Sequence, residues 1–364
     1  MSTNDDAKRP SPVDLLRPAV RAMPGYTPGE QINDLVKLNT NESAYPPSPR
    51  VMAVLTAIAD DTLRLYPDPV SAKLCATAAA LFGVSADQVL AGNGSDDCLT
   101  ILYRAFLEPG DKVACPWPTY GLYDTLATLQ GAELVRVPFR VSARRWELPA
   151  GLGNQRAKMI ILANPNNPSA TLVPVDELRR LCDAAPKAAV VIDEAYVDFS
   201  LAAGIDASML PYLEQHPNLV VLRTMSKGYS LAGARLGLLF AAAPLVTHLM
   251  KVKDSYNVNA VTQALGVAAL EDRSYHEDCV RRTLDQRARL ERELESLGWS
   301  WPESAANFLL CEIGDRAEQI YTALKEEGLL VRWWSAAELR TKIRISVGNS
   351  DENDHLIAAL KRLA

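Results

Sequence analysis

The chain has 364 residues, 48% of them hydrophobic, which is typical of a globular protein with a core large enough for two packed lobes. Its 38 basic and 44 acidic residues leave a formal charge of −6, which favours neither nucleic acid nor an anionic membrane as a partner. No apolar run approaches the roughly 20 residues of a membrane helix, and the start MSTNDDAKRPSP lacks the apolar stretch of a secretory signal. We therefore expect a cytoplasmic protein that does not contact a membrane.

The cysteines and histidines form no ligand pattern. The six cysteines are scattered without a CxxC pair, and the four histidines are far apart. We expect buried cysteines in a reducing compartment, no disulfide framework and no metal site.

Short apolar runs rich in β-forming residues alternate with helical patterns in the first two thirds of the chain. The expected strands lie within residues 88–94, 112–116, 132–138, 158–165, 188–196, 218–226 and 236–241. The expected helices between them are residues 95–106, 120–130 and 175–185. Continuous apolar strands predict a sheet covered on both faces, and their alternation with helices predicts an α/β fold, a three-layer α/β/α domain with a mostly parallel sheet.

The pattern changes toward the C-terminus. Residues 250–297 resemble one long helix, and after Gly298 strands are expected at 307–313, 329–334 and 342–348, with helices at 317–328 and 351–363. These elements predict a small α+β domain. We place an N-terminal arm at 1–36 that adds to this small domain, the large domain at 37–265 and the small domain at 266–364.

Polar residues follow four of the apolar strands, and ligands of open α/β sheets bind beyond the carboxyl ends of strands. In the segment GNGSDD, Gly94, Ser95 and Asp96 stand between a strand and a helix. Backbone amides at a glycine turn and a helix N-terminus form a phosphate cradle. A tight turn with Ser95 or Asp96 as helix cap explains the same residues.

Two further strand ends carry reactive groups. Asp193 ends the apolar run AAVVID, and burying its carboxylate is costly without a partner such as a protonated ring nitrogen. The alternative is that Asp193 caps the next helix. Lys227 ends the segment NLVVLRTMSK, and desolvation beside a buried strand favours a neutral, nucleophilic amine. The alternative is that Lys227 is an ordinary surface lysine. Phosphate-binding groups surround the lysine in sequence, namely Thr224, Ser226 and Arg235.

A phosphate cradle, a buried carboxylate and a lysine at a strand end are together what pyridoxal phosphate requires. At this point the segment SKGYSLAGARLG resembles the cofactor-binding segment of fold-type I aminotransferases. Within them the chain is most similar to the histidinol-phosphate aminotransferase family. The matching segments are LNTNESAYPPSP, YPDP, GNGSDD, PTYGLY, NPNNPS, DEAYVDF, RTMSKGYSLAGARLG, YNVN, LVRWW and IRISVGN.

The resemblance implies a role for individual residues. Lys227 would carry the cofactor and move a proton, and Asp193 would pair with the pyridine nitrogen. Asn167 and Tyr196 would hydrogen-bond the ring oxygen, and Tyr120 would stack on the ring. The groups that would hold the cofactor phosphate are the amides of Gly94 and Ser95, the hydroxyls of Thr224 and Ser226 and the guanidinium of Arg235, and Asp96 is a further cofactor-binding residue. Tyr66 is similar to a family tyrosine that reaches the phosphate from the other subunit, which implies a homodimer with shared active sites.

Substrate recognition is implied for the last domain and the N-terminal segments. Arg344 matches the arginine that binds the substrate α-carboxylate, and Arg332 matches the arginine that binds a substrate phosphate. Tyr26 and Asn41 complete the implied substrate site. The chain departs from the usual family pattern at Asp97, at Gly25 before Tyr26, at Trp333-Trp334 and at SKGYSLAGA, which replaces SKAFGLAGL.

The implied reaction interconverts histidinol phosphate and 2-oxoglutarate with imidazole-acetol phosphate and glutamate, a step of histidine biosynthesis. Three alternatives stay open. An aromatic amino-acid aminotransferase or a threonine-phosphate decarboxylase would use the same cofactor. A cofactor-binding module without catalysis would belong to another class, and the presence of Lys227, Asp193 and Arg344 disfavours it.

Overall fold

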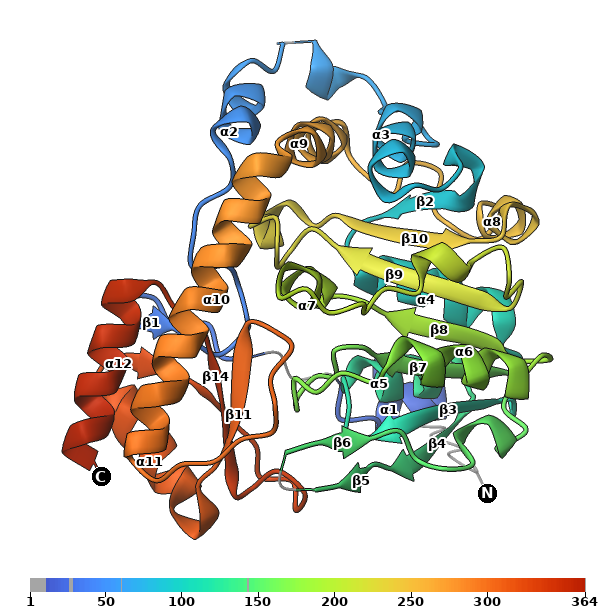
Figure 1. Cartoon of the computed structure of the whole chain (residues 1–364). Coiled ribbons are helices and arrows are strands. Elements are labelled where there is room, and N and C mark those ends of the chain that lie inside the picture. The colour runs from blue at the N-terminus through green and yellow to red at the C-terminus, as the bar shows by residue number, and fades with distance from the viewer. Residues whose placement is uncertain (1–10, 26–28, 60, 143, 364) are drawn as a thin grey trace, which may run out of the picture.

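The computed structural model describes residues 11–25, 29–59, 61–142 and 144–363. A seven-stranded sheet forms the centre of the larger part of the molecule, with strand order β2-β10-β9-β8-β7-β3-β4 (Figure 1). Its strands are β2 (Val89–Gly92), β3 (Lys112–Trp117), β4 (Glu133–Pro138), β7 (Met159–Ala163), β8 (Ala189–Asp193), β9 (Leu219–Thr224) and β10 (Gly237–Ala241). All neighbouring pairs are parallel except those of β10. The predicted α/β fold is thus confirmed.

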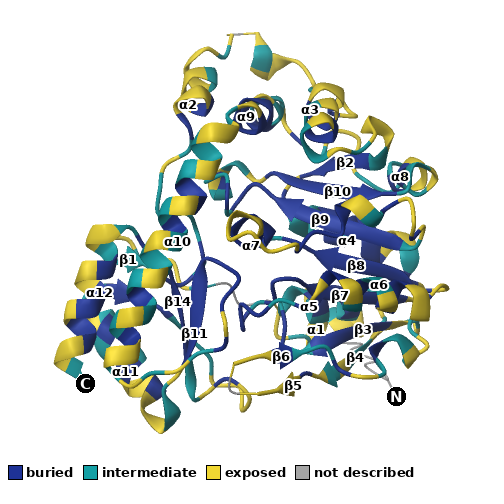
Figure 2. Ribbon diagram, in the orientation of Figure 1, coloured by how far each residue is buried: buried dark blue, intermediate teal, exposed yellow. Residues whose placement is uncertain are grey.

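Helices cover both faces of this sheet because alternate residues of the buried strands point to opposite sides. On one face the core includes Leu74, Leu178 and Leu265, from α3 (Ala72–Phe82), α6 (Val175–Ala184) and α9 (Ala260–Glu271). The other face packs against α4 (Ser95–Phe106), α5 (Leu122–Gln130) and α8 (Ala243–Leu249). Figure 2 shows buried strands between helices that are exposed only on their outer sides.

The C-terminal part has its own sheet and core. Three antiparallel strands pair in the order β11-β14-β13, namely β11 (Phe308–Glu312), β13 (Arg332–Trp333) and β14 (Lys342–Ser346). The helices packed there are α10 (Arg273–Ser296), α11 (Ala317–Glu326) and α12 (Ser350–Leu363). Strand β1 (Val36–Lys37) pairs with β12 (Leu329–Leu330), so an N-terminal segment joins this part. The division of the chain at residues 36 and 265 stays a prediction.

Besides seven short 3-10 helices, the described residues form five further short elements. They are α1 (Pro18–Ala22), α2 (Pro49–Thr56), α7 (Val197–Ala202), β5 (Arg140–Val141) and β6 (Trp146–Glu147). Strands β5 and β6 form a hairpin that reaches the C-terminal part, where the backbone nitrogen of Glu303 donates to the oxygen of Arg144. Within the described residues, no helix is both long and apolar enough to cross a membrane.

The expectation of one helix over 250–297 is wrong. Residues 251–259 are not helical, and α9 begins after Asn259, whose side chain accepts a hydrogen bond from the backbone nitrogen of Thr262 at 2.8 Å. Asp272 then leaves the helical conformation, with φ −98° and ψ 60°, so that α9 and α10 are separate. Apolar periodicity alone did not reveal these two boundaries, because it continues on both sides of each break.

Candidate active site

A cavity of about 580 Å³ lies at the carboxyl ends of the central strands and is closed on one side by the C-terminal sheet. Side chains from both parts of the molecule line it, and residues 39–42 of the N-terminal segment complete it. The predicted site residues among them are Asn41, Ser95, Asp96, Tyr120, Asn167, Asp193, Tyr196, Thr224, Ser226, Lys227, Arg235, Arg332 and Arg344. Segments more than 300 residues apart in the chain therefore meet in one cavity.

Lys227 points into this cavity and not to solvent. It follows the buried strand β9, and its Nζ donates to the backbone oxygen of Thr40 at 2.8 Å. Burial lowers the pKa of Lys227 to about 8, although the carboxylate of Glu42 acts in the opposite direction. The neutral form, which a nucleophile or a base requires, is then roughly a tenth of the amine at pH 7, far more than for an ordinary lysine with a pKa of about 10.4.

Asp193 ends β8, where all five residues are buried. Its Oδ2 accepts a hydrogen bond from the hydroxyl of Tyr123 at 2.9 Å, and its Oδ1 accepts one from the backbone nitrogen of Ala195 at 3.2 Å. Burial raises the pKa of Asp193 to about 6, and the hydrogen bond from Tyr123 opposes that rise. The carboxyl group is therefore mostly ionised at pH 7.

The sequence analysis did not identify Tyr123. It is the second residue of α5 and stands three residues after Tyr120, which precedes that helix, and the two rings meet edge to face with centroids 5.6 Å apart. Helical spacing from Tyr120 was the one signal in the sequence that could have indicated it.

The turn between β2 and α4 has no room for larger residues. Gly94 has φ +87°, and a Cβ there would lie 2.6 Å from Nη2 of Arg235. A Cβ on Gly237 would lie 2.4 Å from the backbone nitrogen of Ser95. No side chain caps α4, so the alternative in which Ser95 or Asp96 caps this helix is wrong. The open N-terminus of α4 instead faces the cavity through Ser95.

Charged and hydroxyl groups surround this turn. Arg235 pairs with Asp96, at 3.3 Å between Nη2 and Oδ2, and Asp96 also accepts from the hydroxyl of Tyr120 at 3.3 Å. The hydroxyl of Thr224 donates to that of Ser226 at 3.0 Å. A helix N-terminus, an arginine and two hydroxyls in one corner suit an anion with several oxygens.

Tyr196 and Asn41 form a buried contact at the other side of the cavity. Nδ2 of Asn41 donates to the hydroxyl of Tyr196 at 3.0 Å, and Oδ1 of Asn41 accepts from Ser346 at 2.9 Å. The ring centroid of Tyr196 lies 5.9 Å from Nζ of Lys227. The amide of Asn41 thus joins the N-terminal segment, the central sheet and β14 beside the lysine.

Arg344 is 6% exposed and is held by two hydrogen bonds of 2.5 Å, from Nη1 to Oδ1 of Asn167 and from Nη2 to the backbone oxygen of Asn39. Arg332 lines the same cavity from the neighbouring strand. These two guanidinium groups make the end of the cavity beneath the C-terminal sheet cationic.

Three predicted residues are not among those that line the cavity. Gly94 lies behind it, against Arg235. Tyr66 is 81% exposed and stacks on Tyr256, with centroids 4.4 Å apart, so it does not serve the cavity of its own chain. Tyr26 lies outside the described residues. The roles of all three stay predictions.

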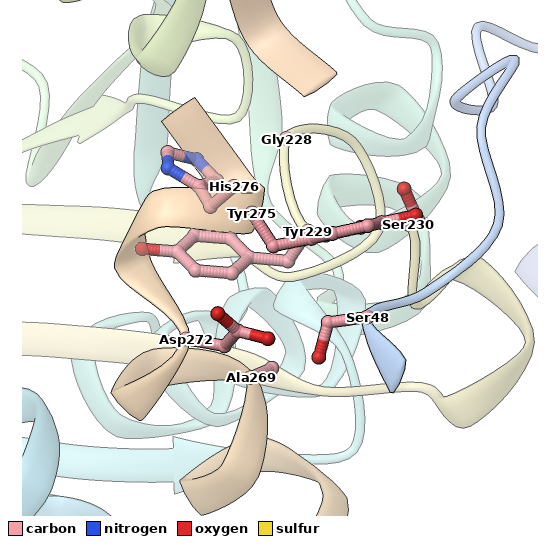
Figure 3. A pocket seen from close by; sticks show the side chains of 8 residues that line it. All are labelled: Ser48, Gly228, Tyr229, Ser230, Ala269, Asp272, Tyr275 and His276. Carbon is pink, nitrogen blue, oxygen red and sulfur yellow. The ribbon is translucent and has the colours of Figure 1, made fainter. Parts of the chain in front are cut away.

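A second, much smaller cavity of about 10 Å³ is lined in part by Gly228, Tyr229 and Ser230, the three residues that follow Lys227 in the chain (Figure 3). Tyr229 stacks there on His276, with ring centroids 4.0 Å apart. A Cβ on Gly228 would lie 2.5 Å from Oδ2 of Asp198 and 2.9 Å from Nε2 of His276. This space has room for about one water molecule and is too small for a substrate.

Comparison with known proteins shows the family of the chain. Residues 33–360 match the family described as aminotransferase class I and II. The chain is 40% identical over 355 residues to histidinol-phosphate aminotransferase 1 of Trichormus variabilis, which covers 96% of this chain and 99% of that protein. It is 38% identical over 353 residues to histidinol-phosphate aminotransferase of Rhodopirellula baltica, with 95% of each chain covered.

Solved structures have the same fold. The histidinol-phosphate aminotransferase of Sinorhizobium meliloti, in complex with pyridoxal-5'-phosphate, superposes with a TM-score of 0.86 at 27% identity, covering 96% of this chain and 98% of that one. An aspartate aminotransferase mutant of Thermus thermophilus superposes with a TM-score of 0.80 at 21% identity, covering 96% and 98%. The chain belongs to the class I and II aminotransferases and, within them, to the histidinol-phosphate aminotransferase family.

Proposed function

We propose that this aminotransferase binds pyridoxal phosphate on Lys227 and exchanges the amino group between histidinol phosphate and 2-oxoglutarate, a step of histidine biosynthesis. One observation carries the proposal. A single cavity of about 580 Å³ brings a lysine with a lowered pKa, a buried carboxylate and two arginines together from distant parts of the chain. The names of the relatives support the choice of substrate.

The residues present fit the cofactor. The corner formed by the N-terminus of α4, Ser226 and Arg235 suits its phosphate, and a side chain at Gly237 would collide with the backbone of Ser95 in that corner. Asp193, ionised at pH 7, suits a protonated ring nitrogen. When bound, the cofactor supplies a ring that takes up the electron pair released at the substrate carbon that bears the amino group.

The chain's own groups then have separate tasks. Lys227 Nζ would hold the cofactor, and its free amine would move the proton at the substrate carbon that bears the amino group. Tyr196, fixed by Asn41, and Asn167 orient the ring oxygen. The same cavity must accept both amino donors in turn, which makes a ping-pong course the expected kinetics.

The cationic end of the cavity binds the anionic groups of the substrates. Arg344, pre-oriented by Asn167 and Asn39, binds the α-carboxylate of glutamate with its planar fork. Arg332 adds a second cation for the phosphate of histidinol phosphate. Replacing Arg332 with Ala should cost phosphorylated substrates about 2–5 kcal/mol and leave glutamate much less affected.

A homodimer is part of the proposal. Exposed apolar side chains gather in the N-terminal half, among them Met52, Leu55, Leu63, Leu65, Tyr66 and Val70. Tyr66 lies outside its own cavity, as expected of a residue that serves the site of the other subunit.

A panel of amino donors tests the substrate. The purified enzyme would be supplied with 2-oxoglutarate and with histidinol phosphate, phenylalanine, tyrosine or threonine phosphate, and both glutamate and carbon dioxide would be measured. We expect glutamate formation with histidinol phosphate at the highest kcat/KM. Turnover of phenylalanine or tyrosine without turnover of any phosphorylated amine would contradict the proposal and favour an aromatic aminotransferase. Carbon dioxide released from threonine phosphate would favour a decarboxylase.

A further inference from the structure

The lysine that is proposed to hold the cofactor begins a tight turn. The backbone nitrogen of Ser230 donates to the oxygen of Lys227 at 3.4 Å, and the backbone nitrogen of Leu231 donates to the oxygen of Met225 at 3.0 Å. Gly228 is the first residue of the turn after the lysine and shares a peptide bond with it. The position of this turn therefore decides where the amine of Lys227 lies in the large cavity.

Two ionisable side chains leave no space behind Gly228. A Cβ on this residue would lie 2.5 Å from Oδ2 of Asp198 of α7 and 2.9 Å from Nε2 of His276 of α10. The imidazole of His276 is itself covered by the ring of Tyr229 (Figure 3). The φ of Gly228 is not positive, so a side chain is excluded by these contacts. They account for the glycine of SKGYSLAGA, which stands where SKAFGLAGL has alanine.

A buried charge network holds Asp198 in place. Oδ1 of Asp198 lies 3.7 Å from Nη1 of Arg223 and 3.7 Å from Nε2 of His276. Arg223, which is 6% exposed, donates in turn to Oε2 of Glu194 at 3.1 Å and to the hydroxyl of Ser208 at 3.0 Å. Burial would raise the pKa of Asp198, but His276 and Arg223 together lower it below its ordinary value. The carboxylate is thus an ionised group whose displacement would separate buried charges.

We propose that Asp198 and His276 are positioning residues that hold the turn at Gly228 and thereby fix the amine of Lys227 in the large cavity. The proposal rests on the proposed function, which gives this amine its task. Neither residue is among those that line the large cavity, so both act through the turn. A turn that moves off this wall carries the amine away from its acceptor, the backbone oxygen of Thr40. A displacement of about 1 Å is enough to slow a reaction between positioned groups roughly a hundredfold.

Substitutions on the two sides of this contact test the proposal by reciprocal rescue. Gly228→Ala adds a methyl group that pushes the turn away, and His276→Ala removes part of the wall. We expect each to lower kcat roughly ten- to a hundredfold with little change in KM for glutamate, because the residues that bind glutamate are untouched. His276→Gln keeps a polar group of similar reach and should recover most of the activity.

The double variant gives the sharpest result. In Gly228→Ala/His276→Ala the added methyl group has space, so kcat should exceed that of Gly228→Ala roughly tenfold, a coupling typical of residues in contact. The same cycle with Asp198→Ala in place of His276→Ala tests the carboxylate. A double variant no more active than Gly228→Ala would overturn the proposal.

Gly266→Ala is the matched control. A Cβ there would lie 2.4 Å from Cδ2 of Leu236 and 2.9 Å from Cδ1 of Leu74, distances close to those at Gly228, but it meets apolar side chains of the core. This variant should lower the melting temperature and change kcat less than about twofold, and its effect should add to that of His276→Ala. A loss of kcat as large as that of Gly228→Ala would show a general loss of packing and contradict a positioning role.

A measurement on the cofactor-free enzyme separates this proposal from the proposed function. Acetic anhydride labels neutral amines, so the midpoint of Lys227 labelling between pH 6 and pH 11, followed by mass spectrometry, gives its pKa. This pKa of about 8 should rise toward the ordinary value of about 10.4 in Gly228→Ala and His276→Ala, where the amine leaves its buried position. It should return toward 8 in the double variant and stay unchanged in Gly266→Ala. The charged groups that act on Lys227 are the same in every variant, namely Glu42, Asp96, Arg235 and Arg344.

The two measurements have distinct outcomes. If the labelling midpoints move as expected while no cofactor is found on Lys227, the proposed function is wrong and the positioning contact stands. If the midpoint is the same in all variants, Asp198 and His276 do not position Lys227.

Discussion

Two ionisable residues acquire their chemistry from where their strands end. Asp193 is the last residue of a fully buried strand and Lys227 follows another, and in both cases burial shifts the pKa in the direction that favours the neutral form. The shift is useful for the lysine, which needs a neutral amine. The same shift is unfavourable for the aspartate, which must stay charged to pair with a cation. The hydrogen bond from Tyr123 opposes the rise in the pKa of Asp193.

Replacing Tyr123 with Phe should move the pH dependence of cofactor binding. Without the hydroxyl the pKa of Asp193 rises further above 6, by roughly one to two units for a hydrogen bond of about 1.5–3 kcal/mol to a charged group. Because the ionised carboxylate is the form that binds, cofactor affinity is lost as pH falls through this pKa, and in the variant the loss begins at higher pH. Titrating the cofactor dissociation constant between pH 5 and pH 9 measures the midpoint.

The matched control is Tyr103→Phe. Tyr103 is as fully buried as Tyr123, but its hydroxyl donates to the backbone oxygen of Tyr123 at 3.1 Å and not to the carboxylate. Its removal should leave the midpoint where the parent enzyme has it. If the midpoint shifts equally in both variants, the effect is a general loss of packing. If it shifts in neither variant, Tyr123 does not lower the pKa of Asp193.

The sequence predicted the site residues at or just after the end of an apolar strand, because the carboxyl ends of such strands lie at the edge of the sheet where ligands bind. It did not predict Tyr123 or the backbone oxygen of Thr40 that receives Lys227. These partners approach from a helix start and from an irregular segment. Their positions depend on tertiary packing, which has no period in the sequence.

At the level of elements, the turn from β2 to α4 is the clearest link between sequence and site. Gly94 adopts φ +87°, a conformation that L-residues rarely adopt, and its missing side chain leaves space for Arg235. The helix that follows begins without a side-chain cap, so its first amides stay available to an anion.

Gly94→Ala should weaken cofactor binding by roughly tenfold or more, because its Cβ displaces the arginine that is proposed to hold the phosphate. Gly83→Ala is the control, since Gly83 has φ +70° and a methyl group added there would meet nothing within 4 Å. Gly94 has φ 87° and ψ 164°, a region that is essentially confined to glycine, whereas Gly83 has φ 70° and ψ 33° in the left-handed helical region, so Gly94→Ala should also lower the melting temperature more. Equal cofactor affinities in the two variants would show that the contact with Arg235 does not matter.

Element boundaries were predicted less well than element types. The seven strands of the central sheet occur where apolar runs predicted them, whereas the long helix expected at 250–297 is interrupted before Asn259 and at Asp272. A capping asparagine and one non-helical residue are local signals that a continuous apolar period obscures.

At the scale of the whole molecule, the site depends on contacts between distant segments. Residues near the N-terminus pair with the C-terminal part through β1 and β12, and Arg344 donates to the backbone oxygen of Asn39. No pattern in the sequence predicts such pairings in detail, and the family resemblance alone placed Arg332 and Arg344 beside the cofactor residues.

Sharing of sites between subunits is tested by complementation. Lys227→Ala and Tyr66→Phe chains, each of low activity alone, would be co-expressed with different tags and the mixed dimer purified. If Tyr66 serves the partner's site, one of the two sites in the mixed dimer has both native residues, and activity should return to about half that of the parent. A mixed dimer no more active than the average of the two parents would place Tyr66 outside the active site.

The central claim is that one cavity joins the amine of residue 227 to the cofactor with the carboxylate of residue 193 opposite. The most direct measurement is to reduce the purified, cofactor-loaded enzyme with borohydride, digest it and map the modified lysine by mass spectrometry. The account predicts a pyridoxyl group on the peptide that contains Lys227, and none in Lys227→Ala. A pyridoxyl group on another lysine, or an unmodified Lys227 in enzyme that still transaminates, would contradict it.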